Sequence, residues 1–395
     1  MNPRNRLALR LRPLYVAVFC MSFVLWYAIE KLFLRSIGFD DALIGVLFAV
    51  ISTTILLAEI PAGVLADRWS RRGVLLLGVV VLAVATGIGA LSNEPSAYFV
   101  SAILWALFFA LYTGMCDSII YDTILEEKVA TKQFDYYLGK VRIMISAATV
   151  GGSLLGGIVG QFMGLRWTYW FTIPVVLVAL VALVKLREPK LHKVSQSTAL
   201  ASHLVGTLKS LLRHRYTLWL VATLALVSAL VYTVLEFTQL WSIALLAPIV
   251  LYGPINALHG AAGGIGGYIV GRVQLARRPT MAITLAIVLV SSVGMAVSRH
   301  LAVTVVAIAL YCIGLFAVMI VFNRYLHDVV PSTVRAGASS IISTLSRIII
   351  VPLSLGIGYL SSQTDIFHAT WLIIGLTVVL VGLIVRSYFG KHALH

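Results

Sequence analysis

The feature that most constrains this sequence is a series of twelve long apolar runs, separated by short stretches that carry charges, glycine or proline. About 20 apolar residues in a helix span the hydrocarbon core of a bilayer. Of the 395 residues, 60% are hydrophobic and 11% are charged, against roughly a quarter charged in soluble proteins. This composition excludes a soluble globular protein, whose surface would be as apolar as its core, and a disordered chain, which requires low hydrophobicity. The runs are approximately 14–35, 42–66, 73–92, 96–125, 139–163, 168–187, 216–239, 246–271, 280–298, 301–326, 335–360 and 368–388.

The basic residues predict the orientation of an all-α, multi-pass integral membrane protein. Of the 30 Lys and Arg residues, 25 lie in the two termini, in the loops on one face or in the ends of the runs that adjoin them. Such residues accumulate in cytoplasmic loops, so we expect both termini to be cytoplasmic and the protein to lie in the inner (plasma) membrane of the cell. The net charge of +15 then marks one membrane face, and the expected partner is the lipid bilayer rather than nucleic acid. The first run has neither the short length nor the small-residue cleavage site of a signal peptide.

The longest hydrophilic stretch divides the chain into two sets of six runs. We expect an N-terminal half at 1–187, a cytoplasmic linker at 188–215 and a C-terminal half at 216–395. Leucines recur at helical spacing within the linker, which predicts an in-plane amphipathic helix on the inner leaflet; a disordered linker is the alternative.

The two halves resemble each other in sequence. Tyr27 and Glu30 in the first run have counterparts in Tyr232 and Glu236, about 205 residues later. Parallel six-helix repeats, related by an axis along the membrane normal, are the mark of one transporter architecture.

A motif between the second and third runs carries a family resemblance. The segment GVLADRWSRRG, from Gly63 to Gly73, resembles the G-x-x-x-D-R-x-G-R-R signature of the major facilitator superfamily, except that Ser70 stands where the family usually has Gly. The segment GLRWTYWFTIP, from Gly164 to Pro174, is similar to that of drug exporters. The resemblance implies two pseudo-symmetric six-helix halves and a secondary transporter that works by alternating access.

The resemblance also implies that this loop latches the two halves on the cytoplasmic side when the protein opens outward. A carboxylate there can meet the positive N-terminal end of a neighbouring helix, and arginines can pair with acids on adjacent helices. The alternative is that these arginines only set the topology. The predicted gate residues are Gly63, Asp67, Arg68, Arg71, Arg72, Asp122 and Arg142.

Ionisable residues inside the apolar runs predict the site of coupling, because charges at membrane depth are costly and usually face a cavity or each other. Asp117 is the leading candidate: nothing in its own run can pair with it, and Thr113 and Tyr121 share its helical face. A carboxylate that alternates between water and the protein interior can release and hold a proton. A cationic substrate would compete with that proton, which is antiport. The predicted cavity and coupling residues are Asp117, Glu30, Glu236, Tyr27, Tyr232, Tyr112, Thr113 and Arg347.

Several of these residues have structural alternatives. Glu30 has a nearby lysine and arginine with which it can pair at the outer surface, and Glu236 lies close enough to the interface to be solvated. Arg347 is either the partner of an acid or a contact for an anion. His259 is either a packed histidine or a proton carrier.

The leading hypothesis is a secondary active transporter that exports small amphipathic or cationic molecules in exchange for protons. The alternative is a proton-coupled uptake symporter of a metabolite or sugar. The run 96–125 contains no Arg or Lys and the run 139–163 no Pro, although drug–proton antiporters of the resembled family usually carry both, and this favours the alternative.

Other function classes lack their motifs. The sequence contains no phosphate-binding loop for ATP, no catalytic set of side chains, and no cysteine spacing typical of a disulfide framework or a metal site. We therefore expect no enzyme, no cofactor and no metal. The expected partners are a small-molecule substrate, protons and the bilayer, and the protein is expected to be a monomer.

Overall fold

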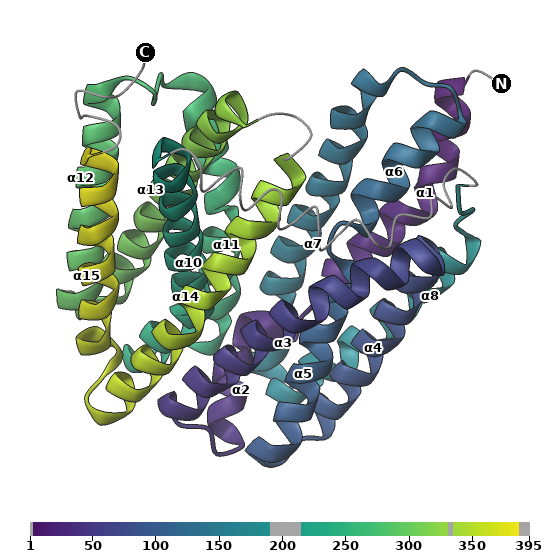
Figure 1. The fold of residues 1–395 in the computed structure, drawn as a ribbon. Helices are drawn as coiled ribbons and strands as arrows, with labels where there is room; N and C mark the ends of the chain where they lie inside the picture. Colours follow the sequence, from purple (N-terminus) through teal and green to yellow (C-terminus); the bar gives the residue numbers. More distant parts are fainter. Residues whose placement is uncertain (1–2, 190–214, 331–334, 387–395) are drawn as a thin grey trace. The chain divides into compact units, whose positions relative to one another are not determined.

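The computed structural model of the protein is helical throughout the regular elements of the residues that it describes, which are 3–189, 215–330 and 335–386 (Figure 1). The side chains of a few helical residues in these ranges, among them Asp67, are also outside the description. The amphipathic helix predicted within 188–215 falls on residues outside these ranges. In chain order the helices are α1 (Pro3–Ser22), the 3₁₀ helix η1 (Trp26–Ile29), α2 (Glu30–Ser36), α3 (Asp41–Arg68), α4 (Arg71–Leu91), α5 (Pro95–Tyr112), α6 (Met115–Glu126), the 3₁₀ turn η2 (Thr131–Gln133), α7 (Phe134–Phe162), α8 (Leu165–Lys185), α10 (Arg215–Ala244), α11 (Ile249–Arg272), α12 (Arg278–Val297), α13 (Leu301–Val329), α14 (Arg335–Gln363) and α15 (Ile366–Ile384).

Eleven helical stretches in the described part of the chain are long and apolar enough to cross a membrane. They correspond to eleven of the twelve predicted runs, with α1, η1 and α2 forming one stretch and α5 and α6 forming another. The eighth run is the helix α11, which is not among the eleven. It contains several glycines, together with Pro254, Asn256 and His259.

The helices form two compact units, each of which is described by itself. Unit 1 comprises Met1–Phe39, Val50–Ser197 and Pro248–Ala257. Unit 2 comprises the remainder of the chain. The first turns of α3 therefore belong to unit 2 and the first turns of α11 to unit 1, whereas the rest of each helix belongs to the other unit.

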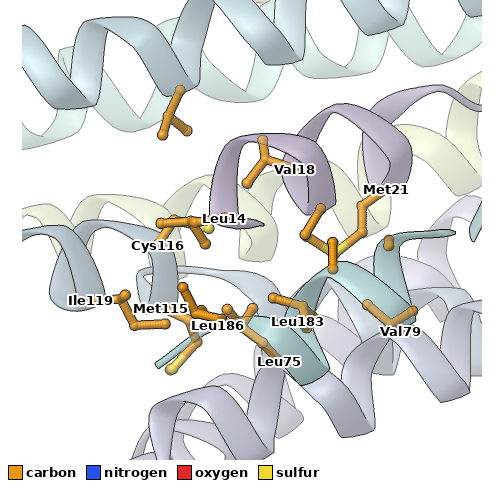
Figure 2. Close-up of a cluster of buried hydrophobic side chains, with 14 of the residues drawn as sticks. Leu14, Val18, Met21, Leu75, Val79, Met115, Cys116, Ile119, Leu183 and Leu186 are labelled. Atoms are coloured by element: carbon orange, nitrogen blue, oxygen red, sulfur yellow. The ribbon is translucent and has the colours of Figure 1, made fainter. Parts of the chain in front are cut away.

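The core of unit 1 lies where α1, α4, α6 and α8 meet, and Figure 2 shows its aliphatic and sulfur-containing side chains in contact. Lipid tails are as apolar as these side chains, so such a core is stabilised by close van der Waals packing more than by the exclusion of water. The core therefore holds these four helices together only where their side chains fit. The labelled members of the cluster are Leu14, Val18, Met21, Leu75, Val79, Met115, Cys116, Ile119, Leu183 and Leu186.

The first membrane span is broken: the predicted run 14–35 lies within one candidate span, Asn5–Ser36, but that span is not one continuous helix. The helix α1 ends at Ser22, and the chain continues through a non-helical segment at residues 23–25 into η1. Backbone groups that are freed at membrane depth must be satisfied by neighbouring elements. The amide of Leu25 accordingly donates to the Thr172 hydroxyl of α8, at 3.1 Å.

Glycines of α7 provide the room for this broken segment. A Cβ atom on Gly156 would collide with the carbonyl oxygen of Leu25, and one on Gly152 would lie 3.1 Å from the backbone nitrogen and oxygen of Val24. Small residues allow helices to approach closely in membranes. Here they admit an unwound backbone instead of a second regular helix.

Unit 2 is built around α10, the most deeply buried of the candidate spans. It lies against α13, α14 and α15. The indole nitrogen of Trp241 donates to the Met295 carbonyl at 3.2 Å, and the Tyr311 and Thr377 hydroxyls are 2.8 Å apart. Because each of these polar groups is paired, they do not add a cost to the buried interior.

Candidate functional site

The fourth membrane span is also broken, and the break places Asp117 at the start of a helix. The predicted run 96–125 corresponds to one candidate span, Pro95–Glu126, but α5 ends at Tyr112 and α6 begins at Met115, so the helix within this span is interrupted. Of the two residues between them, Gly114 has a φ of 76°, a left-handed conformation that favours glycine. Asp117 lies in the first turn of α6, where the positive end of the helix dipole stabilises a carboxylate.

Asp117 is half-buried, whereas Thr113 and Tyr121 are exposed. The Thr113 hydroxyl donates to the carbonyl of Phe109 at 2.8 Å and caps the end of α5. The carboxylate is thus the least exposed of the three polar groups predicted on this side of the fourth span.

A base from another helix lies in the surroundings of Asp117. Tyr112 and Cys116 both lie in the electrostatic surroundings of Asp117 and of Arg142. The prediction from the sequence took into account only bases on the helix of Asp117, and Arg142 lies on α7. Asp117, Arg142 and Tyr112 therefore form one polar region of unit 1.

Arg142 also lies on an open, shallow surface of α7. Apart from the guanidinium and one hydroxyl, its lining is aliphatic, so it offers an apolar surface with a charge at one end. The residues are Arg142, Ile143, Ser146, Ala147 and Val150.

Glu30 lies in the interior of unit 1 and does not face the surface. Its Oε2 atom is 2.6 Å from Nζ of Lys31, and the hydroxyl of Tyr98 donates to Oε1 at 2.7 Å. Glu30 is 5% exposed and Lys31 is 2% exposed. The Tyr98 hydroxyl is in turn 3.0 Å from that of Tyr169. The expected pairing with a nearby base is present, but it is buried and not at the outer surface.

An aromatic layer covers this buried pair. Trp26 stacks on the ring of Tyr169, with ring centres 5.1 Å apart, and meets Trp105 edge to face. Phe33 contacts Tyr169 from another side. Tyr27 is half-buried beside Trp26. These rings come from η1, α2, α5 and α8, and they hold the broken first span against its neighbours.

The second set of charged groups lies at one end of unit 1, which we call the basic end: the end at which α3, α6 and α8 finish and α4 begins. Arg71 forms an ion pair with Asp122 of α6 and also donates to the Ser118 carbonyl at 3.4 Å. Arg72 donates to the carbonyls of Leu183 and Val184, at 3.0 and 2.7 Å. The two adjacent arginines thus join α4 to two different helices.

The first helix contributes to the same end. Arg10 contacts the carboxylates of Glu126 and Glu127 at 2.9 and 2.7 Å, and Arg6 lies 3.5 Å from Glu127. These partners in the gate region, and Glu188, were not predicted from the sequence. Acids are scarce in this chain, and these acids lie beside basic segments that are predicted to be cytoplasmic. That proximity could have indicated ion pairs.

The other predicted gate residues are placed as follows. Gly63 lies in α3, where a Cβ atom would meet no other atom within 4 Å, and Arg68 is exposed at the end of that helix. The side chain of Asp67 is outside the described residues. Arg142 lies beside Tyr112 and Cys116, as described above. Among the predicted gate residues, the structure joins Arg71 and Asp122 in an ion pair.

The remaining predicted residues lie in unit 2. Tyr232 is half-exposed on α10, and Glu236 follows one turn later and is half-buried. Arg347 is half-buried on α14. His259 is 2% exposed; its Nε2 is 3.1 Å from the Val305 carbonyl, while its Nδ1 has no hydrogen-bond partner among the described residues.

Among the residues that the structure describes, no three His, Cys, Asp or Glu side chains are grouped so that they could hold a metal ion. The polar groups of both units are instead arranged as ion pairs and hydrogen bonds, together with half-buried carboxylates such as those of Asp117 and Glu236.

Comparison with protein families gives one match over most of the chain. Residues 13–354 match the family described as Major Facilitator Superfamily. Two bacterial relatives are a tetracenomycin C resistance and export protein of Streptomyces glaucescens, 30% identical over 139 residues, and a methylenomycin A resistance protein of Bacillus subtilis (strain 168), 23% identical over 144 residues. These alignments cover 35% and 36% of this chain, and 25% and 30% of the relatives. The chain therefore spans less than a third of the length of either relative in these matches.

Solved structures share the fold along nearly the whole chain. The nucleoside transporter NupG superposes with a TM-score of 0.76 at 16% identity, covering 97% of this chain and 99% of that one. A bacterial homologue of the human lysosomal transporter Spinster, in an inward-facing and occupied conformation, gives 0.74 at 15% identity, covering 100% and 98%. At such low identity the likeness concerns the fold alone.

Proposed function

The chain belongs to the Major Facilitator Superfamily and is a multi-pass membrane transporter rather than an enzyme, and we propose that it exports small amphipathic or cationic molecules in exchange for protons. The observation that carries this proposal is the half-buried carboxylate of Asp117 at the break between α5 and α6. Discontinuous membrane helices frequently form the binding sites of secondary transporters. The names of the distant bacterial relatives, a resistance and export protein and a resistance protein, support export over uptake.

The proposed coupling rests on competition at Asp117. A carboxylate that faces water releases its proton, whereas an occluded one prefers the neutral form. A cationic substrate stabilises the ionised form, so proton and substrate exclude each other. Glu30 is a weaker candidate because Lys31 already neutralises it in the interior.

We assign the cytoplasmic gate to the basic end of unit 1. The ion pair between Arg71 and Asp122 supports this assignment, and Asp67 and Arg68 belong to it through the family signature.

We further propose that both termini are cytoplasmic, that the protein lies in the plasma membrane, and that it works as a monomer. Tyr27, Tyr112, Thr113, Tyr232, Glu236 and Arg347 remain proposed cavity residues.

Direct measurement of flux tests the coupling and its direction. Proteoliposomes containing the purified protein should accumulate external ethidium, a permanent lipophilic cation, when the lumen is made acidic. Valinomycin and equal potassium on both sides remove the membrane potential as a driving force. A symporter would instead accumulate the probe when the outside is acidic. The uptake alternative keeps the support of the sequence, since the run 96–125 contains no Arg or Lys and the run 139–163 no Pro.

Replacing Asp117 by Asn should abolish accumulation of ethidium driven by the pH gradient, because the amide cannot bind and release a proton. Exchange of internal for external probe at equal pH should persist at a reduced rate, since the cavity remains. Asp328→Asn is the matched control, because this carboxylate is exposed near the end of α13. Full pH-driven accumulation by Asp117→Asn would remove Asp117 from the mechanism and leave Glu236 as the next residue to test.

The orientation is tested with two exposed loop residues, Asn93 and Gln274. Because the three native cysteines are buried, the parent chain serves as the background for Asn93→Cys and Gln274→Cys. In intact cells an impermeant maleimide should label the cysteine at position 93 and reach the one at position 274 only after permeabilisation. The reverse labelling pattern would invert the proposed topology.

A further inference from the structure

The turn between α3 and α4 is held by a carboxylate that follows α8. The Ser70 hydroxyl donates to Oε2 of Glu188 at 2.6 Å, and the other carboxylate oxygen is 3.5 Å from the amide nitrogen of Arg72. Ser70 also caps α4, because its hydroxyl oxygen accepts a hydrogen bond from the Gly73 amide at 2.8 Å. One side chain thus uses both its donor and its acceptor at the point where the family signature usually has glycine.

Glu188 and Arg72 form a reciprocal contact between two helix ends. Glu188 follows the last turn of α8 and places its negative charge at the positive N-terminus of α4. Arg72 belongs to the first turn of α4 and binds the carbonyls of Leu183 and Val184, in the last turn of α8. Cations at a helix C-terminus satisfy its free carbonyls and its dipole. Each helix end therefore receives the charge that complements it.

We call the contacts among Ser70, Arg72, Glu188 and the last turn of α8 the clasp. The clasp determines where the neighbouring residue, Arg71, is placed. Arg71 follows Ser70 directly and forms the ion pair with Asp122 of α6. Ser70 has an extended backbone (φ −172°, ψ 128°) that turns the chain from α3 into α4. The position of this one residue thus decides whether Arg71 reaches α6 while Arg72 reaches α8.

We propose that Ser70 and Glu188 are positioning residues of the cytoplasmic gate: together they fix the turn that directs Arg71 onto Asp122. The inference rests on the proposed gate, but the clasp itself is a separate claim about the structure. Glycine at position 70 would leave the turn free and the Glu188 carboxylate without its hydroxyl donor. Ser70 therefore adds an interaction that the family signature does not provide.

Hydrogen–deuterium exchange tests the clasp without any substrate. Glu188→Ala should raise the exchange of peptides covering residues 69–74, more than a hundred residues away in the sequence. Ser70→Ala should do the same, and the double variant should exchange no faster than the faster single variant. The turn at residues 92–97 is the control, because Glu94 accepts a hydrogen bond from Ser96 there at the start of α5. Unchanged exchange at residues 69–74 in Glu188→Ala would overturn the proposal.

Transport kinetics test the positioning role. With ethidium as the probe, Ser70→Ala and Glu188→Ala should lower kcat by about three- to tenfold and leave KM within about twofold. The substitutions alter the gate and not the binding site. A change of this size in kcat corresponds to about 1 kcal/mol in the activation free energy. Ser70→Thr keeps the hydroxyl and should restore the parental rate, and Glu94→Ala and Ser96→Ala should transport normally. Normal kcat despite faster exchange at the turn would overturn the positioning role. If the parent does not transport ethidium, the proposed substrate class fails, while the exchange measurement still decides whether the clasp exists.

Discussion

Gly156→Ala should be among the most damaging single substitutions in this protein. The added methyl group would occupy the place of the Leu25 carbonyl oxygen, and the carbonyl carbon of the same residue is only 2.9 Å away. Because the obstacle is backbone, no side chain can rotate to make room. We expect a loss of about 3 kcal/mol, the upper end for overpacking, visible as a lower melting temperature and a smaller folded fraction of the detergent-purified protein.

Gly139→Ala is the matched control on the same helix. No atom lies within 4 Å of the Cβ position at Gly139, and alanine is the better helix former by roughly 1 kcal/mol. This variant should therefore melt at or above the parental temperature. If both variants melted like the parent, α7 would not pack against the broken first span as described.

The existence of the helices was predictable from the sequence, whereas the breaks in two of them were not. Apolar runs of sufficient length define membrane spans because the bilayer imposes their length. The segment Phe23 to Ile29 is as apolar as a regular helix, and its conformation depends on a glycine face of α7 and on the Thr172 hydroxyl. Those partners are more than a hundred residues away, so no local pattern reveals them.

The fourth span carried a partial signal. Gly114 follows Thr113 in the middle of the run, and a glycine inside a helical pattern lowers the stability of the helix. Such a residue is compatible with a continuous helix as well as with a break, and only the positive φ decides between them. Asp117 lies at the start of α6 because the helix is interrupted at Gly114.

The gate region also contains features that were predictable from the sequence and features that were not. The signature around Asp67 and Arg71 was visible in the sequence because its spacing is fixed within a few residues. Its acceptors lie elsewhere in the chain: Asp122 is on α6, and Glu188 follows the end of α8. Asp122 was predicted from the sequence, and Glu188 was not. An acid next to a basic linker is expected to be a solvated charge unless the end of α8 is known to lie beside the start of α4.

Lys31→Met should destabilise the protein by about 3–5 kcal/mol, because it leaves the buried Glu30 carboxylate without its cation. Lys31 Nζ is 2.6 Å from the carboxylate, and after the substitution only the Tyr98 hydroxyl would remain among the contacts shown for Glu30. The methionine side chain has a similar length, so the loss of charge dominates over the loss of volume. We expect the melting temperature of the purified protein to fall by on the order of 10 °C.

The double variant Glu30→Gln/Lys31→Met distinguishes an uncompensated charge from lost packing. Replacing both members of a buried ion pair is far less costly than removing one, so the double variant should melt well above Lys31→Met. Lys185→Met is the control for the chemical change, since Lys185 is exposed at the end of α8 and should alter stability by no more than about 0.5 kcal/mol. A double variant as unstable as the single one would mean that Lys31 acts through its packing in the interior, and that Glu30 does not depend on its charge.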